Sequence, residues 1–412
     1  MKTLRSVLFF ILFISTVSAY GFFEKLPSPE DTEFSLLTVG VGSGLESRFG
    51  HTILRVRDKS TGEDHLLNWG TYDWEAPNFV LNFLKGFLRY WVAESTFAST
   101  LRYYRDYEKR SIVEDRINLT PEQKSQLLKI LVAKLQPEGK YFWYDFFYNN
   151  CSTIPRDVLN AVLHNRVAEA GHKLAATMNL RAYVRRDLSE WSVVAFFLDI
   201  MLNREVDKTI DAWVEMFVPL MLRNYLSHLP QFDDQGQPIS GTHLLSDQRE
   251  LVAGGVYPSS SINFFLCCLI ASLLVLGSVL WLRLRNSRWA DVLLAFSCIV
   301  WGLFAGFLGI LLLLGWTYSN HILLNHNANM WVFWPIDGIL VAFGIAVLCR
   351  KNPSAKLWQF FFGAHLLALA VFIVGYCGAF FIQDVSNIAR YLVPIAVLLY
   401  GMLLRRKISH TL

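Results

Sequence analysis

Cys151 is the first residue of this chain whose type and setting suggest chemistry. It lies in the segment FYNNCSTIPRD, residues 147–157, and no other cysteine occurs before residue 267. Asn149 and Asn150 are turn and cap residues, and Pro155 is tolerated in a first helical turn. A helix is therefore predicted to begin beside Cys151, and its dipole would lower the pKa of the thiol and favour the reactive thiolate. The alternative is that Cys151 is only a small buried apolar residue.

A nucleophilic thiol needs a base to take its proton and a third group to orient that base. His51 opens a predicted strand, residues 51–58, directly after Gly50 in the segment SRFGHTILRV. Side chains alternate along a strand, so Asn68 on the predicted strand 65–70 would lie beside His51 if the two strands pair in suitable register. An asparagine oxygen can hold one tautomer of an imidazole through its ring N–H.

Other assignments remain open in this hairpin. A histidine at the start of a strand is commonly a surface residue or a satisfied core residue, and Asp64, His65 and Asp73 are alternatives to Asn68 as the orienting group. The order His, Asn, Cys reverses the usual order of cysteine enzymes, which would make the arrangement circularly permuted. The sequence contains no metal-binding signature, no phosphate-binding glycine loop and no Gly-x-Ser-x-Gly elbow, so neither a metal nor another cofactor is predicted.

The chain that must position these residues is predicted to have three parts. Residues 1–19 have Lys2 and Arg5 before an apolar run and small residues at Val17 and Ala19, the pattern of a secretory signal peptide. If this segment is not cut, it would be a membrane anchor in the same orientation, and the following domain would be exported in either case. Residues 20–261 read as an exported periplasmic domain and residues 262–412 as a transmembrane domain. The chain has 412 residues and a net charge of +4, but no basic run that would suggest nucleic acid.

The transmembrane domain is predicted to have five helices, each long enough to span a bilayer. They cover residues 262–282, 289–316, 330–349, 357–382 and 385–404. Basic residues follow the first, third and fifth helices: Arg283, Arg285, Arg288, Arg350, Lys351, Lys356, Arg405, Arg406 and Lys407. Positive charges mark cytoplasmic loops, so the domain of residues 20–261 is predicted to face the periplasm of a multi-pass inner-membrane protein.

The exported domain has an α+β pattern, with short predicted strands and helices around a small antiparallel sheet. From residue 175 to residue 230 the chain becomes helical and apolar. These helices would either pack on the sheet as an amphipathic bundle or lie near the bilayer and shelter an acyl chain. In the membrane domain, the loop 318–329 is predicted on the periplasmic face, where His326 and Asn329 are candidates for contact with substrate, although such residues are ordinary at a membrane interface.

Three segments resemble one known family. SRFGHTILRVRD, LLNWGTYDW and YDFFYNNCSTIPRD are similar to the Ser-x-Phe-Gly-His, Asn-x-Gly and Asn-Cys-x-Thr-x-x-Arg-Asp segments of the Lnb N-terminal periplasmic domain family, over about residues 20–260. That family resembles permuted NlpC-like and papain-like cysteine enzymes, including lecithin:retinol acyltransferase-like proteins. The resemblance implies a permuted papain-like fold with helical additions. By motif, it makes Cys151 the nucleophile, His51 the base and Asn68 the orienting residue, supported by Ser47, Asn150 and Arg156.

Family members with a membrane domain are implicated in bacterial lipoprotein N-acylation. The resemblance therefore implies an acyltransferase that moves an acyl chain from a phospholipid, through a thioester on Cys151, to the α-amine of a lipoprotein. Two alternatives remain at this stage. One is a membrane-anchored cysteine hydrolase that cuts a peptide, amide or ester bond of the envelope, and the other is a non-catalytic folding helper for an exported protein.

Overall fold

The computed structural model describes residues 27–73, 75–254, 262–349 and 355–404. The predicted signal peptide lies outside these residues, as do Arg350, Lys351 and the basic residues after 404. The chain forms two compact units, and each is described by itself. Unit 1 contains residues 1–79, 88–177 and 211–257, and unit 2 contains residues 80–87, 178–210 and 258–412.

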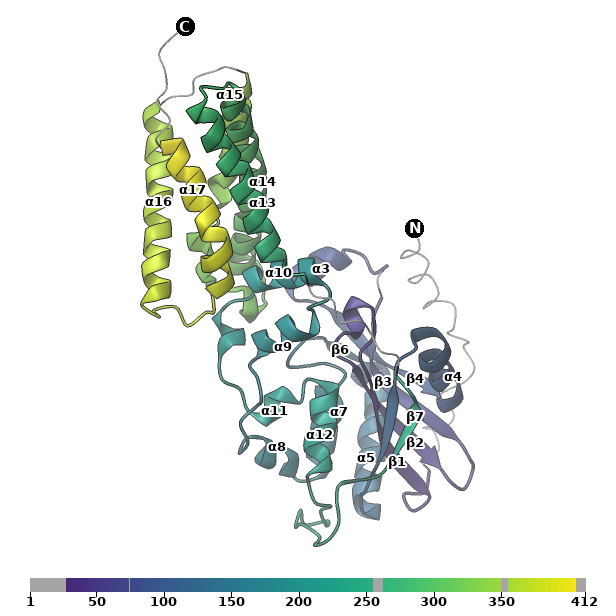
Figure 1. The fold of residues 1–412 in the computed structure, drawn as a ribbon. Helices are drawn as coiled ribbons and strands as arrows, with labels where there is room; N and C mark the ends of the chain where they lie inside the picture. The colour runs from purple at the N-terminus through teal and green to yellow at the C-terminus, as the bar shows by residue number, and fades with distance from the viewer. Residues whose placement is uncertain (1–26, 74, 255–261, 350–354, 405–412) are drawn as a thin grey trace. The chain divides into compact units, whose positions relative to one another are not determined.

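Unit 1 contains one antiparallel sheet of seven strands in the order β6-β4-β3-β2-β1-β5-β7 (Figure 1). The strands are β1 (Thr32–Val39), β2 (His51–Asp58), β3 (Asp64–Thr71), β4 (Arg89–Thr96), β5 (Ile112–Ile117), β6 (Tyr141–Trp143) and β7 (Leu245–Val252). The predicted α+β class is confirmed. Strands β6 and β7 were not predicted, and both form edges of the sheet. The exposed, charged residues of β7 hide its strand character because an edge strand buries little surface.

The alternation of side chains along the strands gives this sheet two apolar faces. Phe34, Leu36, Leu54 and Leu67 pack on one face against three helices, α5 (Pro121–Leu135), α7 (Thr153–Val162) and α12 (Pro219–Ser227). Leu37, Val39, Ile53 and Leu66 point to the opposite face, where they pack with Phe97 and Leu101 of α4 (Phe97–Arg102). Helices therefore pack on both faces of this sheet.

Short helices complete unit 1. Residues 103–108 extend α4 as a π-helix, which ends where Lys109 adopts a left-handed φ of 55°. Thr120 and Gln123 form the reciprocal capping box that starts α5, as the sequence TPEQ predicts. The remaining helices are α6 (Pro137–Lys140), α8 (Arg166–Gly171) and α11 (Ala212–Glu215).

Unit 2 combines the helical segment of residues 178–210 with the apolar helices. It contains α9 (Leu180–Asp187), α10 (Ser192–Met201), α13 (Phe264–Leu284), α14 (Trp289–Thr317), α15 (Ile339–Leu348), α16 (Ala355–Cys377) and α17 (Val393–Leu404). Helix α3 (Phe79–Lys85) falls almost entirely in this unit. Phe196 and Ile200 of α10 belong to the same apolar core as α13, α14 and α17.

Charged and polar bonds reinforce this joining of residues 178–210 to the apolar helices. Asp199 receives two bonds from Arg185, at 2.8 and 3.0 Å, and one from the Asn387 amide at 2.8 Å. Arg185 also pairs with Asp384 at 2.6 Å. Part of the apolar segment 175–230 thus packs with the membrane helices, while α12 packs on the sheet of unit 1. The predicted domain boundary near residue 261 remains a prediction.

Three described helices are long and apolar enough to cross a membrane: Phe264–Leu284, Trp289–Thr317 and Lys356–Cys377. A bent pair, Ile322–Trp331 with Pro335–Leu348, raises the number to four if it is one span, and its halves meet at 59°. Pro335 begins the second half, because a proline is tolerated in the first turn of a helix but not in its interior. The last segment, Ile388–Leu404, is shorter. The predicted count of five spans therefore stays a prediction.

Candidate active site

The site begins with the tight turn before β2. Gly50 has a left-handed φ of 82°, and a Cβ atom there would lie 2.9 Å from the Val39 carbonyl oxygen. Ser47 is buried in the preceding turn, and its hydroxyl donates to the Gly44 carbonyl at 2.8 Å. Glycine is required at position 50 because other residues rarely adopt this backbone conformation. The turn delivers His51 as the first residue of β2.

His51 and Asn68 are in direct contact, as strand alternation predicted. His51 Nε2 lies 2.7 Å from Asn68 Oδ1. An amide oxygen only accepts, so Nε2 donates and Nδ1 is left as the bare, basic nitrogen. The pairing of β2 with β3 matches Leu54 with Leu67, and the same register extended toward the start of β2 would bring Gly70 opposite His51. A Cβ atom at Gly70 would lie 2.8 Å from the imidazole Cε1, so the glycine leaves room for the ring.

The three alternative orienting residues have other partners. Asp64 accepts two hydrogen bonds from Arg55, at 2.8 and 2.5 Å. His65 pairs with Glu94 at 2.6 Å. Asp73 accepts from the backbone N–H of Glu75 at 2.8 Å. Among the candidates in this hairpin, Asn68 is therefore the one in contact with His51.

Cys151 lies just before α7, and the backbone N–H of Thr52, the residue after His51, hydrogen-bonds its sulfur. The residue is half-buried. Asn150 sets this position: its Oδ1 accepts from the backbone N–H groups of Ser152 and Thr153, at 2.8 and 2.9 Å, and so caps the helix. Its Nδ2 donates to the Phe217 carbonyl at 3.1 Å. Asn150 thus fixes the Cys151 backbone at the start of α7, next to β2.

Arg156 anchors the other side of this helix turn. Its guanidinium stacks over the Trp213 ring at 3.7 Å and donates to the Trp213 carbonyl at 2.6 Å. It also pairs with Asp157. Arg156 therefore holds α7 to the segment that leads into α12, which is a supporting role.

The electrostatics of the site differ from the expectation for a helix N-terminus. Although part of Cys151 reaches the surface, burial of the thiol raises its pKa to about 11, and this outweighs the backbone N–H groups and the Arg110 charge, which lower it. Burial, followed by the Arg110 charge, lowers the pKa of His51 to about 4, although the bond to Asn68 opposes this. The predicted low thiol pKa is thus wrong. At neutral pH the resting pair is a neutral thiol and a neutral imidazole.

Stacked tyrosine rings surround the site and interact electrostatically with the thiol. Tyr90 stacks on Tyr144 with ring centroids 4.2 Å apart, and Tyr72 stacks on Tyr90 at 4.6 Å. Burial raises the pKa of Tyr90 and of Tyr144, and a charge on Cys151 would raise both further, which places these rings near the thiol. Sequence reasoning missed them, since single tyrosines on or just after a strand carry no signal of their own.

The two membrane-face candidates belong to unit 2. Asn329 is fully buried, and its Nδ2 donates to the Ile200 carbonyl at 2.8 Å, which ties its loop to the end of α10. His326 is exposed, with a left-handed φ of 46° and its ring 5.1 Å from the Trp316 ring. Asn329 therefore has a packing role within unit 2.

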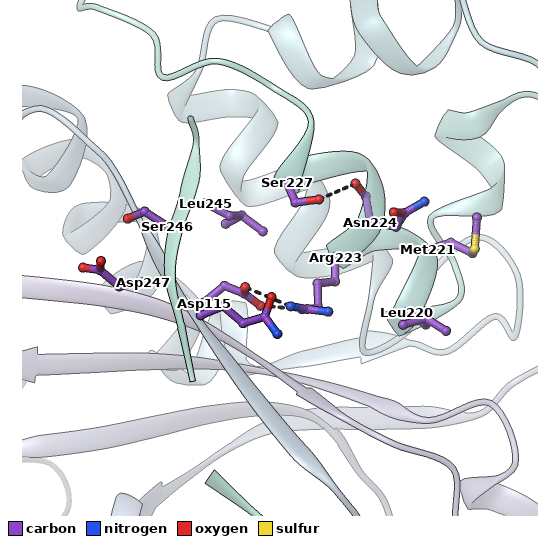
Figure 2. Close-up of a pocket in the computed structure, with 10 residues that line it drawn as sticks. Asp115, Leu220, Met221, Arg223, Asn224, Ser227, Leu245, Ser246 and Asp247 are labelled. Atoms are coloured by element: carbon purple, nitrogen blue, oxygen red, sulfur yellow. Dashed lines mark hydrogen bonds and ion pairs between the residues drawn. The ribbon is translucent and has the colours of Figure 1, made fainter. Parts of the chain in front are cut away.

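A separate open cavity of about 460 Å³ lies in unit 1 between α12 and β7 (Figure 2). Arg223 and Asp115 face each other in it as a two-bond ion pair, at 2.5 and 3.1 Å, and the Ser227 hydroxyl donates to the Asn224 carbonyl. Its lining contains none of the predicted site residues. In the described part of the chain, no three His, Cys, Asp or Glu side chains gather as ligands of a metal would.

Residues 24–186 match the family model described as the Lnb N-terminal periplasmic domain. The chain carries a domain of this family. The match includes His51, Asn68 and Cys151, and with the apolar helices of unit 2 it identifies a membrane-associated envelope protein whose N-terminal domain is periplasmic. Neither a curated protein nor a solved structure matches the chain. The permuted papain-like description of the fold therefore stays a prediction.

Proposed function

We propose that the protein is a multi-pass inner-membrane acyltransferase that uses Cys151 to move an acyl chain from a phospholipid to the α-amine of a lipoprotein. The observation that carries this proposal is the contact of His51 with Asn68 beside the strand residue that hydrogen-bonds the Cys151 sulfur. A thiol, an imidazole and an amide oxygen in this arrangement are the components of cysteine acyl transfer.

The first half-reaction acylates the enzyme. His51 Nδ1 takes the thiol proton as the Cys151 sulfur attacks the ester carbonyl carbon, because the high thiol pKa leaves little thiolate beforehand. The tetrahedral intermediate collapses, the ester C–O bond breaks, and the imidazolium gives its proton to the departing lysophospholipid oxygen. Asn68 holds the ring through Nε2 during both transfers. The product is a thioester on Cys151.

The second half-reaction releases the acyl chain. The lipoprotein amine attacks the thioester carbonyl, His51 Nδ1 takes a proton from the amine, and the C–S bond breaks. The proton then returns to the Cys151 sulfur, so the enzyme is restored. The tyrosine rings near the thiol would limit access of water, which favours the amine as acceptor.

A cysteine hydrolase is the second candidate, since water could replace the amine in this scheme. The partial exposure of Cys151 is the observation that favours it. A folding helper would need neither the His51–Asn68 contact nor the thiol.

Mass spectrometry of the full-length protein in detergent separates these functions. Incubation with phospholipid and no acceptor should add one fatty-acyl mass to the peptide that contains Cys151, and hydroxylamine should remove it. Addition of a lipoprotein with a free α-amine should also remove it and yield the N-acylated lipoprotein. Steady release of free fatty acid without acceptor would favour the hydrolase, and an unmodified Cys151 with every lipid would reject the acyltransferase.

A further inference from the structure

Arg110 is a buried arginine at the same end of the sheet as His51. The strand register pairs His51 with Val39 and Val39 with Ile112, so these three residues form one row across β2, β1 and β5. Arg110 lies two residues before Ile112, and it is only 5% exposed. A guanidinium is costly to bury, and it is normally retained where each of its N–H groups has a partner.

The hydrogen bonds of Arg110 are incomplete. Its Nε donates to the Gly40 carbonyl at 2.7 Å, and its Nη1 lies 3.5 Å from Glu108 Oε2. Its Nη2 is buried without a hydrogen-bond partner in the part of the chain that the structure describes. Glu108 also accepts from the Tyr103 hydroxyl at 2.9 Å, and the Arg110 guanidinium lies 5.3 Å from the centre of the Tyr104 ring.

A second buried arginine, Arg181, has hydrogen-bond partners for its guanidinium nitrogens. Arg181 is 1% exposed, and its Nε and Nη2 both donate to Asp207, at 2.6 and 2.9 Å. Its Nη1 donates to Asp199, and its Nη2 also reaches two backbone carbonyls. Compared with Arg181, Arg110 has donor capacity left over at Nη2.

The stem of Arg110 runs beside the glycine-rich loop 40–44. A Cβ atom at Gly42 would lie 3.0 Å from Arg110 Cδ and 2.4 Å from the Ser47 hydroxyl oxygen, so only glycine fits between them. The positive charge of Arg110 acts on both reacting groups: it lowers the pKa of Cys151 and the pKa of His51. The charge of Arg110 is therefore felt at both reacting groups, while its Nη2 is a buried donor without a hydrogen-bond partner among the described residues.

We propose that Arg110 binds the phosphate of the phospholipid donor through Nη2. A phosphodiester offers only acceptor oxygens and carries a negative charge, which matches a buried guanidinium in both respects. In a phospholipid, the phosphate lies a few bonds from the acyl esters, so one molecule can present an ester to Cys151 and its phosphate to Arg110. This inference rests on the acyl-transfer function proposed above and deepens it, since it makes Arg110 the residue that selects a phospholipid over a neutral lipid.

The test compares two donors that carry the same acyl chains, a phospholipid and a diacylglycerol, by the rate at which each acylates Cys151. Full-length wild-type protein should prefer the phospholipid. In Arg110→Gln the phospholipid rate should fall about ten- to a hundredfold more than the diacylglycerol rate, the range expected for a charged hydrogen bond. Arg110→Lys keeps the charge and loses the planar fork, so it should retain part of the preference.

Arg116→Gln is the matched control. Arg116 is on β5 and pairs with Asp247 at an exposed site, so its loss should leave both rates unchanged. Thermal unfolding of each variant reports whether the fold survives, and Arg110→Lys serves as the test if Arg110→Gln does not fold. A wild-type protein without donor preference, or an equal loss for both donors in the folded Arg110 variant, would overturn the inference.

A binding measurement separates failure of this inference from failure of the proposed function. Cys151→Ala protein is titrated with a short-chain phospholipid, with glycerol phosphate and with a short-chain diacylglycerol. Binding of the phospholipid that is lost with Arg110→Gln supports the inference even if no lipid acylates Cys151. If glycerol phosphate binding falls with Arg110→Gln as much as phospholipid binding does, Arg110 recognises the phosphate ester and not the rest of the lipid. Phospholipid binding that is indifferent to Arg110 rejects it.

Discussion

Each compact unit places a histidine against an oxygen acceptor, but the two surroundings differ. In unit 1, His51 Nε2 lies 2.7 Å from Asn68 Oδ1, at the start of a strand next to the residue that bonds Cys151. In unit 2, His365 Nε2 lies 3.1 Å from Asp337 Oδ1 and both side chains are fully buried, but neither ring nitrogen of His365 makes a hydrogen bond with a described residue. The Trp334 and Tyr400 rings lie against His365, with centroids at 4.0 and 4.3 Å.

A reactive pair and a packing pair differ in what surrounds them. Asp337 also accepts from the Tyr400 hydroxyl at 2.9 Å and from the backbone N–H of Trp334 at 2.9 Å, so it joins segments that are distant in the chain. Such a sealed group among apolar helices holds the helices together. The His51 ring is instead held through Nε2 at the start of β2, and the next residue, Thr52, hydrogen-bonds the half-buried Cys151 sulfur. We therefore expect the chemistry in unit 1, and the predictions below test that contrast.

The largest effect is expected from Cys151→Ala. It should remove acyl-enzyme formation and turnover, a loss of at least about a thousandfold, because the reaction has no other nucleophile. Cys151→Ser should be almost as inactive, since a hydroxyl is a far weaker nucleophile beside one imidazole. Thermal unfolding should be close to wild type, because alanine keeps a small apolar side chain. Turnover that survives in the alanine variant would leave the folding helper as the function.

The next effect contrasts the two histidines directly. His51→Ala should lower the acylation rate nearly as much as Cys151→Ala, because the members of a catalytic unit are not additive. His365→Phe should instead keep most of the rate and change the free energy of unfolding, by about 1–3 kcal/mol, because it alters a buried polar contact. Rates and unfolding are measured on the same preparations. The opposite pattern would place the chemistry in unit 2.

A smaller effect is expected for the orienting residue. Asn68→Ala should reduce the acylation rate about ten- to a hundredfold, since the base remains but its ring is no longer held. Asp64→Asn is the control in the same hairpin, because Asp64 pairs with Arg55 instead of His51. Equal losses in the two variants would show that the hairpin is merely destabilised, and unfolding measurements would reveal that.

The smallest effect is a shift in pH dependence. Protonated His51 cannot act as base, so the acidic limb of the acylation rate should lie near its pKa of about 4, below the ordinary histidine value of 6.5. Arg110→Gln removes a charge that lowers this pKa, so the limb should move to higher pH. Asn68→Ala removes a bond that raises it, so the limb should move to lower pH. Shifts in the same direction would show that His51 is not the titrating base.

The residues of the site were predictable from the sequence to different degrees. Alternation along the strands placed His51 and Asn68 on one face, and the register that matches Leu54 with Leu67 made that placement a contact. The helix start at Cys151 was also predictable from its cap residues. The thiol pKa was not, because burial of the thiol in the folded domain outweighs the backbone N–H groups that lower it.

Other features depend on contacts that a sequence pattern does not record. Arg110 follows Lys109 in a charged stretch, and nothing in the sequence distinguishes a buried arginine from a solvated one there. Strand β7 buries few residues, so it lacks the apolar alternation of a central strand. For residues 178–210, the apolar pattern indicated burial but not which of two apolar surfaces would provide it.

The division of residues between the units has a consequence for synthesis. Among the described residues, the chain passes from one unit to the other at 79/80, 87/88, 177/178 and 210/211, and again between residues 254 and 262. Helices α9 and α10 therefore leave the ribosome and cross the membrane before their packing partners, α13 to α17, have been translated. The apolar side chains of Phe196 and Ile200 therefore stay exposed until the residues beyond 264 that cover them have been synthesised. The nascent protein thus has an interval in which a periplasmic chaperone would bind it, and truncation near residue 261 would make that interval permanent.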